Sequence, residues 1–582
     1  MDIKPKNYHV SINKLSFTNK LYVIANPGRQ VFYNPLKNNA MFLKSALPVL
    51  ALAFNVLVVF AQSKEFDIRA YGAKPDGVTN NVVAIQRAID AAAAAGGGRV
   101  LIPRGRFLSG VIHLKSGVEL NIHEEAVLLG SINRADYGPS LKASAFIAAD
   151  GAKNIAITGK GLIDGQCDLL IEDIYKKLRA GELEDDEWKE FNPWHQRRPS
   201  ERNRPRIIEF RNCDGVTIKN IRVQNSTAWV QNYKNCSNII IDSVNVFSNT
   251  FWNNDGIDLV DCRNARVTNC IINAADDGIC LKSEDRNNRC ENIVVANCKV
   301  RSSASAIKLG TASRGGFKDI TIKDIEVYDT YRSAIAIETV DGGVLEDITV
   351  ENINARNTGN AIFIRLGHRN KDAVYSQLRN VHIANVKVSV PKGKPDKDYP
   401  MEGPGLKYPS NYKADASVKP QSVSPWNSGI DSSAVPYPHN VFPSSITGLP
   451  GHHIENVTLE NVEIIYEGGA SKNVNHIPLT SIDKITEAES AYPEFSMFGE
   501  LPAWGLYVRH VKGLTLKNVQ LKFMNEDLRA ACIFNDVDGL RLNDVSISSY
   551  KELPIIVLKD VKEQQFDNLK LPVPSSKAVK VQ

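Results

Sequence analysis

Three aspartates have the residue type and spacing that acid–base chemistry requires. Asp255 closes the run Asn253-Asn254-Asp255, and the pair Asp276-Asp277 begins twenty-one residues later. On adjacent turns of a repeating fold these carboxyls would fall within one sugar ring of each other, because neighbouring strands lie about 4.8 Å apart. Like charges at that distance raise one pKa and leave a protonated acid beside ionised bases. Hydrolysis of a glycosidic bond with inversion uses that division, typically with carboxyls about 6.5–9.5 Å apart.

Plainer explanations of the same aspartates stay open at this point. Asp-Gly is common in ordinary turns, and a group of carboxylates can bind Ca²⁺. We expect neither a metal nor a cofactor at this site.

A repeated phrase surrounds the aspartates and predicts how they are positioned. Its five copies start at positions 255, 277, 305, 333 and 360, at steps of 22, 28, 28 and 27 residues, and read DGIDL, DGICL, SAIKL, SAIAI and NAIFI. A unit of this length indicates a solenoid, in which each repeat buries its apolar face against its neighbours. Alternation turns the Ile and Leu residues inward, while Gly or Ala at the second position leaves shallow space outside.

Charged residues border this shallow groove. We expect the side chains of the phrase and of the residues just after it to contact a substrate: Asn254, Asp258, Lys282, Lys308, Glu338, Arg365, His368 and Arg369. A groove floored by small residues and walled by carboxylates and cations suits a carbohydrate. For each basic residue, a surface salt bridge is the alternative.

Alternation also raises a difficulty for two of the aspartates. It turns Asp276 outward but gives Asp255 and Asp277 the inward parity. They reach the groove only if the chain bends just before each strand, and we expect Gly256 and Gly278 to permit that bend.

A second phrase marks another face of the solenoid. Its fourth residue is small and polar: Asn220, Ser243, Asn269, Asn297, Asp324 and Asn352. Such residues tolerate a left-handed bend and can hydrogen-bond up a ladder, so we interpret them as structural. The phrase recurs to about Ile547, so one all-β parallel β-helix domain is predicted for residues 62–572.

The first part of this domain contains a predicted helix. Thr79 or Asn80 can cap it, Val83, Ile85, Ala88 and Ile89 form its apolar face, and Gly96–Gly98 end it. Such a helix covers the open core of a first coil. The opening resembles the N-terminal part of the right-handed β-helices of the pectate-lyase superfamily.

Long insertions interrupt the predicted coils at residues 166–204, 391–450 and 467–502. Loops of this length are usually functional. They could close one end of the groove, which would favour exo over endo attack. Residues 573–582 are predicted to form a disordered tail.

The start of the chain has the features of an export signal. Met41-Phe-Leu-Lys44 precedes an apolar run from Ala46 to Phe60 that ends in small residues. We predict that residues 1–61 are a leader and secretory signal peptide with Met41 as the true start. The mature protein is then periplasmic, extracellular or on the cell surface. A buried helix is the alternative for the apolar run.

Removal of this leader changes the charge balance. The remaining chain has 63 basic and 64 acidic side chains, against 70 and 65 in the whole sequence. A net charge near zero gives no reason to expect nucleic acid or an anionic membrane as a partner. The run of about fifteen apolar residues is too short for a comfortable membrane span, and we expect a monomer without one.

The nine cysteines show no spacing typical of zinc. Cys270 and Cys298 occupy equivalent places in successive repeats, which indicates buried thiols. Cys280 and Cys290 are the first pair to test for a disulfide.

Residues from about 204 to 350 resemble glycoside hydrolase family 28, the polygalacturonases and rhamnogalacturonan hydrolases. The segments that carry the resemblance are RPRIIEF from Arg204, NSTAW from Asn225, NNDGID from Asn253 and ADDG from Ala275. The resemblance implies that Asp276 is the general acid and that Asp255 and Asp277 together activate a water. It implies a secreted inverting hydrolase that acts on a galacturonate-containing pectic polysaccharide or oligosaccharide.

Two departures from the family pattern bear on the substrate. Ala304-Ser305-Ala306 stands where polygalacturonases have Gly-His-Gly, and Ala336-Ile-Glu338 stands where they have Arg-Ile-Lys. That Arg and Lys would hold a galacturonate carboxylate beside the scissile bond. Their absence favours a mixed or branched pectic substrate of the rhamnogalacturonan type over simple homogalacturonan.

Two other functions remain as alternatives. A uronate lyase or epimerase on the same scaffold would need Ca²⁺ and a base such as Lys282 or Lys308. A non-catalytic glycan-binding β-helix would need none of the acids for its function.

Overall fold

The structure is a computed structural model and describes residues 64–188, 199–400, 406–407, 434–435, 440–469, 477–549 and 554–582. Residues 63–582 form one compact unit. The predicted leader, with Met41 and the apolar run, lies outside the described residues. All three aspartates belong to the unit of residues 63–582.

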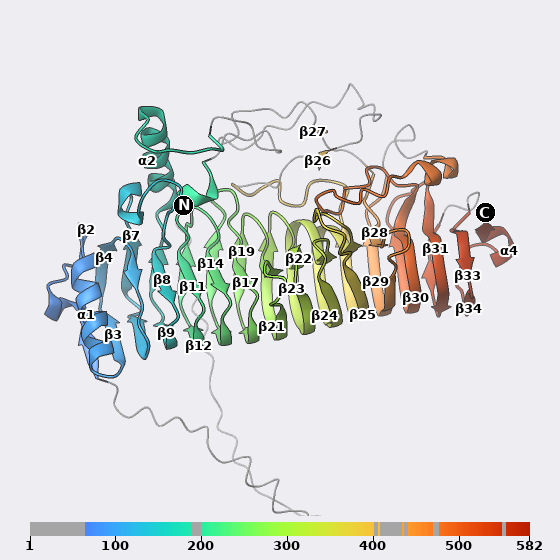
Figure 1. Ribbon diagram of the computed structural model, residues 1–582. Coiled ribbons are helices and arrows are strands. Elements are labelled where there is room, and N and C mark those ends of the chain that lie inside the picture. Colours follow the sequence, from blue (N-terminus) through green and yellow to red (C-terminus); the bar gives the residue numbers. More distant parts are fainter. Residues whose placement is uncertain are drawn as a thin grey trace, which may run out of the picture. The chain divides into compact units, whose positions relative to one another are not determined.

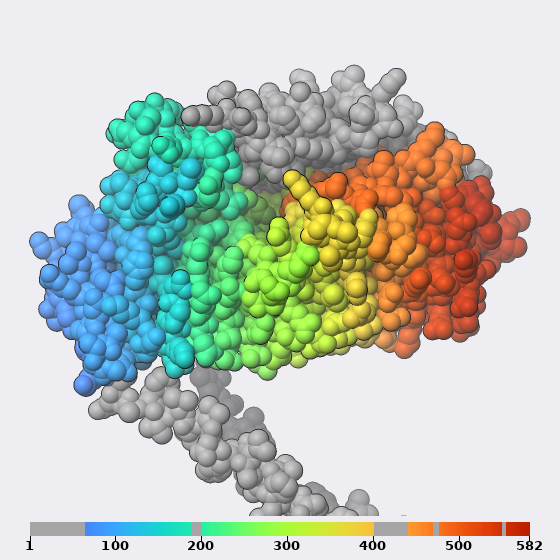
Figure 2. Space-filling view, in the orientation of Figure 1, coloured from blue at the N-terminus to red at the C-terminus, as the bar shows by residue number. Residues whose placement is uncertain are grey.

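This unit is an all-β right-handed parallel β-helix, as the repeats predict (Figure 1). Three short strands form each coil, and each strand pairs in parallel with the equivalent strand of the next coil. The central coils show the pattern clearly: β11 (Ile208–Arg211), β12 (Asp214–Lys219) and β13 (Arg222–Gln224) pair with β14 (Gln231–Lys234), β15 (Ser237–Asp242) and β16 (Asn245–Ser248). The colours of Figure 2 advance along the surface in sequence order, since each coil contacts only its neighbours.

The first coils are built from short strands. They are β1 (Glu65–Asp67), β2 (Asp76–Asn80), β3 (Gly98–Ile102), β4 (Gly105–Ser109), β5 (Ile112–His113), β6 (Val118–Ile122), β7 (Ala126–Gly130), β8 (Ile147–Asp150), β9 (Lys153–Gly159) and β10 (Leu162–Asp164). Short 3₁₀ helices follow β1 and β7 at Ile68–Tyr71 and Arg134–Tyr137, and a third lies at Glu201–Asn203.

From the middle of the chain onward, some strands are long enough to continue past a corner of the coil, such as Gly316–Thr339 with 24 residues and Val344–Leu366 with 23. The strands are β17 (Ile257–Val260), β18 (Arg263–Thr268), β19 (Ile271–Ala274), β20 (Ile279–Ser283), β21 (Cys290–Ser302), β22 (Ile307–Ser313), β23 (Gly316–Thr339), β24 (Val344–Leu366), β25 (Gln377–Val390), β28 (Ser444–Thr447), β29 (Ile454–Tyr466), β30 (Ala503–Phe523), β31 (Ala530–Asn543), β32 (Ser546–Ile547), β33 (Ile556–Lys562) and β34 (Gln565–Asp567). A separate antiparallel pair is formed by β26 (Leu406–Lys407) and β27 (Ala434–Val435).

The interior of the coils is filled by the apolar positions of the repeated phrase. Ile257, Leu259, Ile279 and Leu281 are fully buried. At the corners, the small polar residues adopt the expected left-handed backbone, with φ of 57° at Asn269. Their amides form a ladder, in which Asn352 donates to Asp324 at 2.8 Å. These residues are therefore structural, as predicted.

Helix α1 (Val82–Ala94) packs on the first coil and buries Ile85, Ala88 and Ile89. It begins one residue later than the predicted caps allow, because Asn81 precedes it. The Asn81 amide bonds the carbonyls of Lys74 and Leu108 instead of capping the helix. Val83, which the sequence pattern assigns to the apolar face, is 58 % exposed.

The prediction of a disordered tail at residues 573–582 is wrong. Residues 573–582 are ordered, with helix α4 (Ser575–Ala578) followed by strand β35 (Val579–Val581), which pairs with β33. The last coil of a solenoid exposes a row of unpaired backbone donors and acceptors. Strand β35 satisfies them, and the fully buried Ala578 covers the core.

The described residues of the insertions include short regular elements. The first contains helix α2 (Cys167–Ala180), which buries Leu170, Ile171 and Ile174. The third contains a 3₁₀ helix at Leu479–Lys484. Among the described residues, no helix combines the length and the apolar character needed to cross a membrane.

All nine cysteines are described, and all are buried free thiols. The pair Cys280 and Cys290 is not joined: Cys280 faces the carbonyl of Gly310 at 3.1 Å, and Cys290 faces the carbonyl of Leu259 at 3.3 Å. Cys270 and Cys298 lie on neighbouring coils of the core, as their spacing predicts.

Candidate active site

The three aspartates lie at one corner of two neighbouring coils, just before strands β17 and β20. These strands pair in register, so that Ile257 faces Ile279. The backbone N–H groups of Gly256 and Gly278 donate to the carbonyls of Asp277 and Ser305 at 2.9 Å. The corner therefore continues the ladder of the coils.

Gly256 and Gly278 are needed here for close approach. A Cβ on Gly256 would lie 2.5 Å from the carbonyl oxygen of Gly278. A Cβ on Gly278 would lie 2.6 Å from the carbonyl oxygen of Ala306. The sequence predicts a bend at these glycines, and the structure shows in addition that any side chain would push the coils apart.

The three carboxyls come together as their spacing predicts. One oxygen from each of Asp255, Asp276 and Asp277 lies within 4.8 Å of the other two. Asp276 is partly exposed, whereas Asp255 and Asp277 are 3 % and 4 % exposed. The oxygens are closer together than the carboxyl separation of about 6.5–9.5 Å typical of inverting glycosidases.

Two lysines from the outward columns stabilise this concentration of negative charge. Lys282 Nζ lies 2.8 Å from Asp255 and also contacts Asp258. Lys308 Nζ lies 3.1 Å from Asp277 and 3.9 Å from Glu338. Each amine therefore bridges two carboxylates, because strands β17, β20, β22 and β23 stack the columns at this face.

These surroundings give the carboxyls different pKa values. Burial and the charges of Asp255 and Asp277 raise the pKa of Asp276 to about 7. Burial also acts on Asp277, but Lys308, Lys282 and Arg332 outweigh it and hold the pKa of Asp277 below its ordinary value. A protonated acid and an ionised base can therefore coexist near neutral pH.

Asp255 and Asp258 share their amine. Burial and the neighbouring Asp258 raise the pKa of Asp255 well above its ordinary value, although Lys282 acts in the opposite direction. Burial raises the pKa of Asp258 to about 6, against the attraction of Lys282. The same Lys282 ammonium lies 4.2 Å from the ring centre of Trp229, which covers it from the other side.

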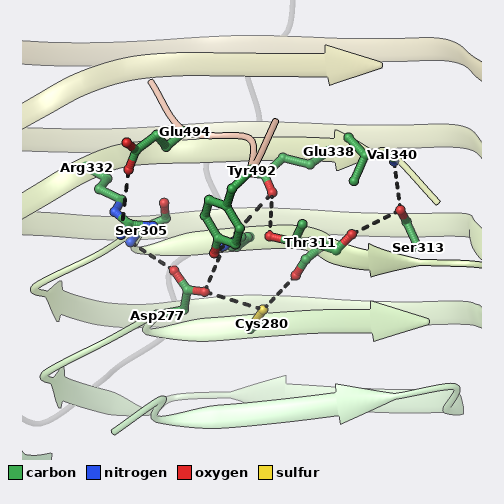
Figure 3. A network of polar contacts seen from close by, with 12 residues as sticks. Asp277, Cys280, Ser305, Thr311, Ser313, Arg332, Glu338, Val340, Tyr492 and Glu494 are labelled. Carbon is green, nitrogen blue, oxygen red and sulfur yellow. Dashed lines mark hydrogen bonds and ion pairs between the residues drawn. The ribbon is translucent and has the colours of Figure 1, made fainter. Parts of the chain in front are cut away.

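A loop of the third insertion closes over this site. Tyr492 hydroxyl lies 3.1 Å from Lys308 Nζ, and Glu494 lies 3.7 Å from Arg332 (Figure 3). Sequence reasoning missed these three loop and rim residues. Arg332 directly precedes a repeat phrase and could have been found from that position, but nothing in the irregular segment distinguishes Tyr492 or Glu494.

Five of the expected substrate contacts are at most 2 % exposed: Asn254, Asp258, Lys308, Glu338 and Arg365. The three in the middle of this list form the ion pairs described above, whereas Asn254 and Arg365 are placed elsewhere. Asn254 is fully buried, where its amide accepts from Ser248 at 2.8 Å and donates to the Ala228 carbonyl at 3.0 Å. Arg365 is 1 % exposed and donates to the carbonyls of Gly448 and Glu487. Both side chains donate hydrogen bonds to backbone carbonyls, because carbonyls at corners and in loops have no partner in a strand ladder and need one when they are buried.

The last two expected contacts lie at the rim of the same face. His368 is partly exposed and stacks on Tyr375 at 4.0 Å between ring centres. Arg369 is partly exposed and forms a two-pronged ion pair with Asp341, at 2.9 and 2.8 Å. Each is positioned to contact a part of a ligand that extends beyond the three acids.

The three aspartates are also a set of oxygens that could hold a cation. In this structure the amines of Lys282 and Lys308 already neutralise two of the three. A Ca²⁺ ion takes six to eight oxygens. The donor set therefore suits proton transfer better than metal binding.

Comparison with known proteins agrees with this geometry. A family model for glycosyl hydrolases family 28 matches residues 94–399, more than half of the chain. Over 122 residues the chain is 41 % identical to an exo-poly-α-D-galacturonosidase of Dickeya chrysanthemi. The matched segment covers 18 % of this chain and 20 % of that protein. Over 281 residues it is 26 % identical to a probable polygalacturonase of Vitis vinifera, which covers 44 % and 53 %.

The chain thus matches at most about half the length of these two curated relatives. Among solved structures, a hyperthermoactive exopolygalacturonase from Thermotoga maritima superposes with a TM-score of 0.50 at 21 % identity, over 69 % of this chain and 87 % of that one. This similarity supports the shared right-handed β-helix.

Proposed function

Because the chain belongs to glycosyl hydrolases family 28, we propose that it hydrolyses glycosidic bonds in a galacturonate-containing pectic polysaccharide or oligosaccharide, with inversion at the anomeric carbon. Asp276 is the general acid, and Asp255 and Asp277 activate the water. The observation that carries the hydrolase assignment is the meeting of the three carboxyls at one corner, with one oxygen of each within 4.8 Å of the others. Inversion is proposed from the resemblance to the family, because this distance is shorter than the separation typical of inverting enzymes.

The assignment of the acid rests on the different surroundings of the two neighbouring aspartates. Asp276 is the most exposed of the three, and its raised pKa of about 7 keeps it protonated in mildly acidic solution. A protonated carboxyl at this position can donate to the oxygen of the leaving group. Asp277 is ionised under the same conditions, because lysines lower its pKa.

The assignment of the base rests on distance. A water bonds a carboxylate oxygen at about 2.8 Å, so one water can donate to two oxygens that lie within 4.8 Å of each other. Asp255 and Asp277 satisfy that condition, and each is fixed by a lysine. The pKa of Asp255 is raised and that of Asp277 is lowered, so Asp277 takes the proton and Asp255 orients the same water. The shared water is then held for attack on the sugar face opposite the leaving group.

The charges beside the acids support a mixed pectic substrate. Glu338 occupies the position where polygalacturonases have a lysine, and Lys308 is paired with both Glu338 and Asp277. Burial raises the pKa of Glu338 to about 7, so this position offers no cation to a uronate carboxylate, whereas a neutral sugar needs none. We therefore favour a rhamnogalacturonan-type substrate, in which neutral and acidic sugars alternate, over homogalacturonan.

A panel of defined oligosaccharides tests this proposal. Purified protein is incubated with oligogalacturonates and with rhamnogalacturonan oligosaccharides, and Asp276→Asn serves as the inactive control. Release of new reducing ends from the mixed oligosaccharides, lost in the variant, supports the proposal. Release from oligogalacturonates alone would contradict the substrate, and no release from any would contradict the function.

The same samples distinguish the competing reactions. Proton NMR of the first product gives its anomeric configuration, and inversion is expected. An unsaturated sugar, detected by its ultraviolet absorbance and lost on addition of EDTA, would show a lyase instead. Binding without turnover that survives Asp276→Asn would show a glycan-binding protein.

We also propose that the mature protein is exported, on the basis of the apolar run Ala46–Phe60 behind Met41. N-terminal sequencing of the protein recovered from cell fractions tests this. A mature end near residue 62 in a periplasmic, surface or medium fraction supports export, and an intact leader in the cytoplasm contradicts it.

A further inference from the structure

Two histidines and an aspartate form a second cluster, on a different corner of the β-helix from the acids described above. His453 Nε2 lies 2.9 Å from Asp536 Oδ2, and His510 Nδ1 lies 2.6 Å from the same oxygen. One ligand atom from each residue lies within 4.8 Å of the other two. The proposed hydrolysis uses none of them.

The repeat of the fold brings these residues together. Ile454 of β29 pairs with Val511 of β30, and Val511 pairs with Val537 of β31. The residues directly before these positions are His453, His510 and Asp536, so three successive coils place them one above another. In earlier coils the same corner is occupied by Asn212 and Asn235, each with a positive φ of 53°.

We propose that His453, His510 and Asp536 form a binding site for a divalent transition-metal ion, with Zn²⁺ as the reference ion. Two imidazoles and one carboxylate are a typical zinc ligand set with one position left for water. Ligand atoms about 2.0 Å from a tetrahedral zinc lie about 3.3 Å from each other. The two distances to Asp536 need to open by less than 1 Å, and the two imidazole nitrogens already lie within 4.8 Å of each other. Asp536, with a side chain that is 45 % exposed, has room to move.

A fourth residue provides independent support for the site. Both carboxylate oxygens of Glu487 lie 3.2 Å from His510 Nε2, on the side of the ring away from Asp536. Histidines that bind metal usually donate their second N–H to a carboxylate, which fixes the tautomer and the orientation of the ring. Glu487 is itself held by Arg509.

The hydrogen bonds of His510 show why a cation fits. Both of its ring nitrogens face carboxylate oxygens, and a neutral imidazole carries only one N–H. If Nε2–H donates to Glu487, the lone pair of Nδ1 points at Asp536, where two acceptors oppose each other. An imidazolium, which donates from both nitrogens, satisfies the two carboxylates; a metal ion between Nδ1 and Asp536 does so as well and turns both atoms into ligands.

The site would also connect the far coils with the loop over the candidate active site. Glu487 precedes Tyr492 by five residues in the same described segment, and its carbonyl accepts from Arg365 at 2.7 Å. A metal ion that fixes His510 would thereby hold Glu487 and the segment that positions Tyr492 beside Lys308.

Zinc binding to the full chain tests the proposal. Protein prepared without a histidine tag is stripped with a chelator, and Zn²⁺ alone is titrated in competition with a chromophoric chelator. His510→Asn places at this corner the residue that earlier coils use, and Asp536→Asn keeps a residue that tolerates the positive φ of 54°. His382→Asn is the matched control, because His382 contacts Glu460 at 3.4 Å outside the cluster.

We expect wild type and His382→Asn to bind one tight Zn²⁺, and His510→Asn and Asp536→Asn to lose about 100-fold or more in affinity for it. Loss of Glu487 by Glu487→Gln should cost about 10- to 100-fold. Zinc-edge X-ray absorption should show two imidazoles, with ligands at about 2.0 Å. Equal affinity and stoichiometry in wild type and both cluster variants, or a zinc bound mainly to sulfur at about 2.3 Å, would overturn the proposal.

Discussion

Lys308 Nζ lies 3.1 Å from the carboxylate of Asp277, and Glu338 of the following coil lies 3.9 Å from the same amine. The amine is 2 % exposed, so the interaction is shielded from water. Buried ion pairs of this kind persist when further contacts compensate their desolvation. Here the pair keeps an essential carboxylate ionised in a cluster of like charges.

Replacement of this lysine should therefore impair the base. Without its cation, Asp277 in Lys308→Met should have a higher pKa, and the acidic limb of the pH profile of kcat/KM should move to higher pH. We expect kcat/KM to fall by about 100-fold at neutral pH, the scale of general-base catalysis. Lys299→Met is the control, because Lys299 pairs with Glu326 elsewhere on the surface. An unchanged acidic limb would contradict this role of Lys308.

The pKa of Asp276 predicts the basic limb of the same profile. The protonated form is the general acid, so activity should fall as pH rises through about 7. Arg332 favours the ionised form of Asp276, so Arg332→Met should move this limb to higher pH. Steady-state rates from pH 4 to 9 on one oligosaccharide measure both limbs. Activity that stays constant up to pH 9 would argue against Asp276 as the acid.

The loop hydroxyl on Lys308 can be removed with little change of shape. Tyr492→Phe deletes the hydrogen bond at 3.1 Å, and a hydrogen bond to a charged group is worth about 1.5–3 kcal/mol. We expect about a tenfold loss of kcat/KM and only a small fall in the melting temperature. Tyr328→Phe, on a ring that faces Lys299 and Arg356, should leave activity unchanged. Equal activity of both variants would show that the loop does not contribute to catalysis.

Arg365 should contribute to stability and not to substrate binding. Arg365→Met leaves the buried carbonyl of Gly448 and the partly buried carbonyls of Glu487 and Ala488 without this donor. Unsatisfied buried groups cost about 1–3 kcal/mol each, so we expect a loss of about 2–4 kcal/mol in the free energy of unfolding. Urea denaturation measures it, with the exposed Arg356→Met as control. A raised KM with unchanged stability would instead favour a role of Arg365 in substrate binding.

The architecture could be predicted from the sequence because the same pattern of apolar and polar residues recurs in each coil of a solenoid. Five phrases with Ile or Leu at the third and fifth positions define the core, and the polar corner residues define the turns. The same periodicity brings Asp255, Asp276 and Asp277 together. Register between coils is fixed wherever one face of a strand is buried, so residues at equivalent positions of neighbouring phrases become neighbours in space.

The features that could not be predicted are contacts and segments that the repeated pattern does not determine. Asn254 and Arg365 have the right position in the phrase, but their side chains turn toward backbone groups that only the folded corner or loop presents. Tyr492 belongs to a segment with no period at all. The ordered tail depends on the unpaired edge of the last coil, which local composition does not reveal.

The central claim is that Asp276 protonates the leaving group of a glycosidic bond. The most direct test is kcat/KM of wild type and Asp276→Asn on a rhamnogalacturonan oligosaccharide, with circular dichroism to show that the variant is folded. We expect the wild type to release reducing ends and kcat/KM of the variant to be lower by about 10³-fold or more. A folded Asp276→Asn protein with wild-type activity would contradict it.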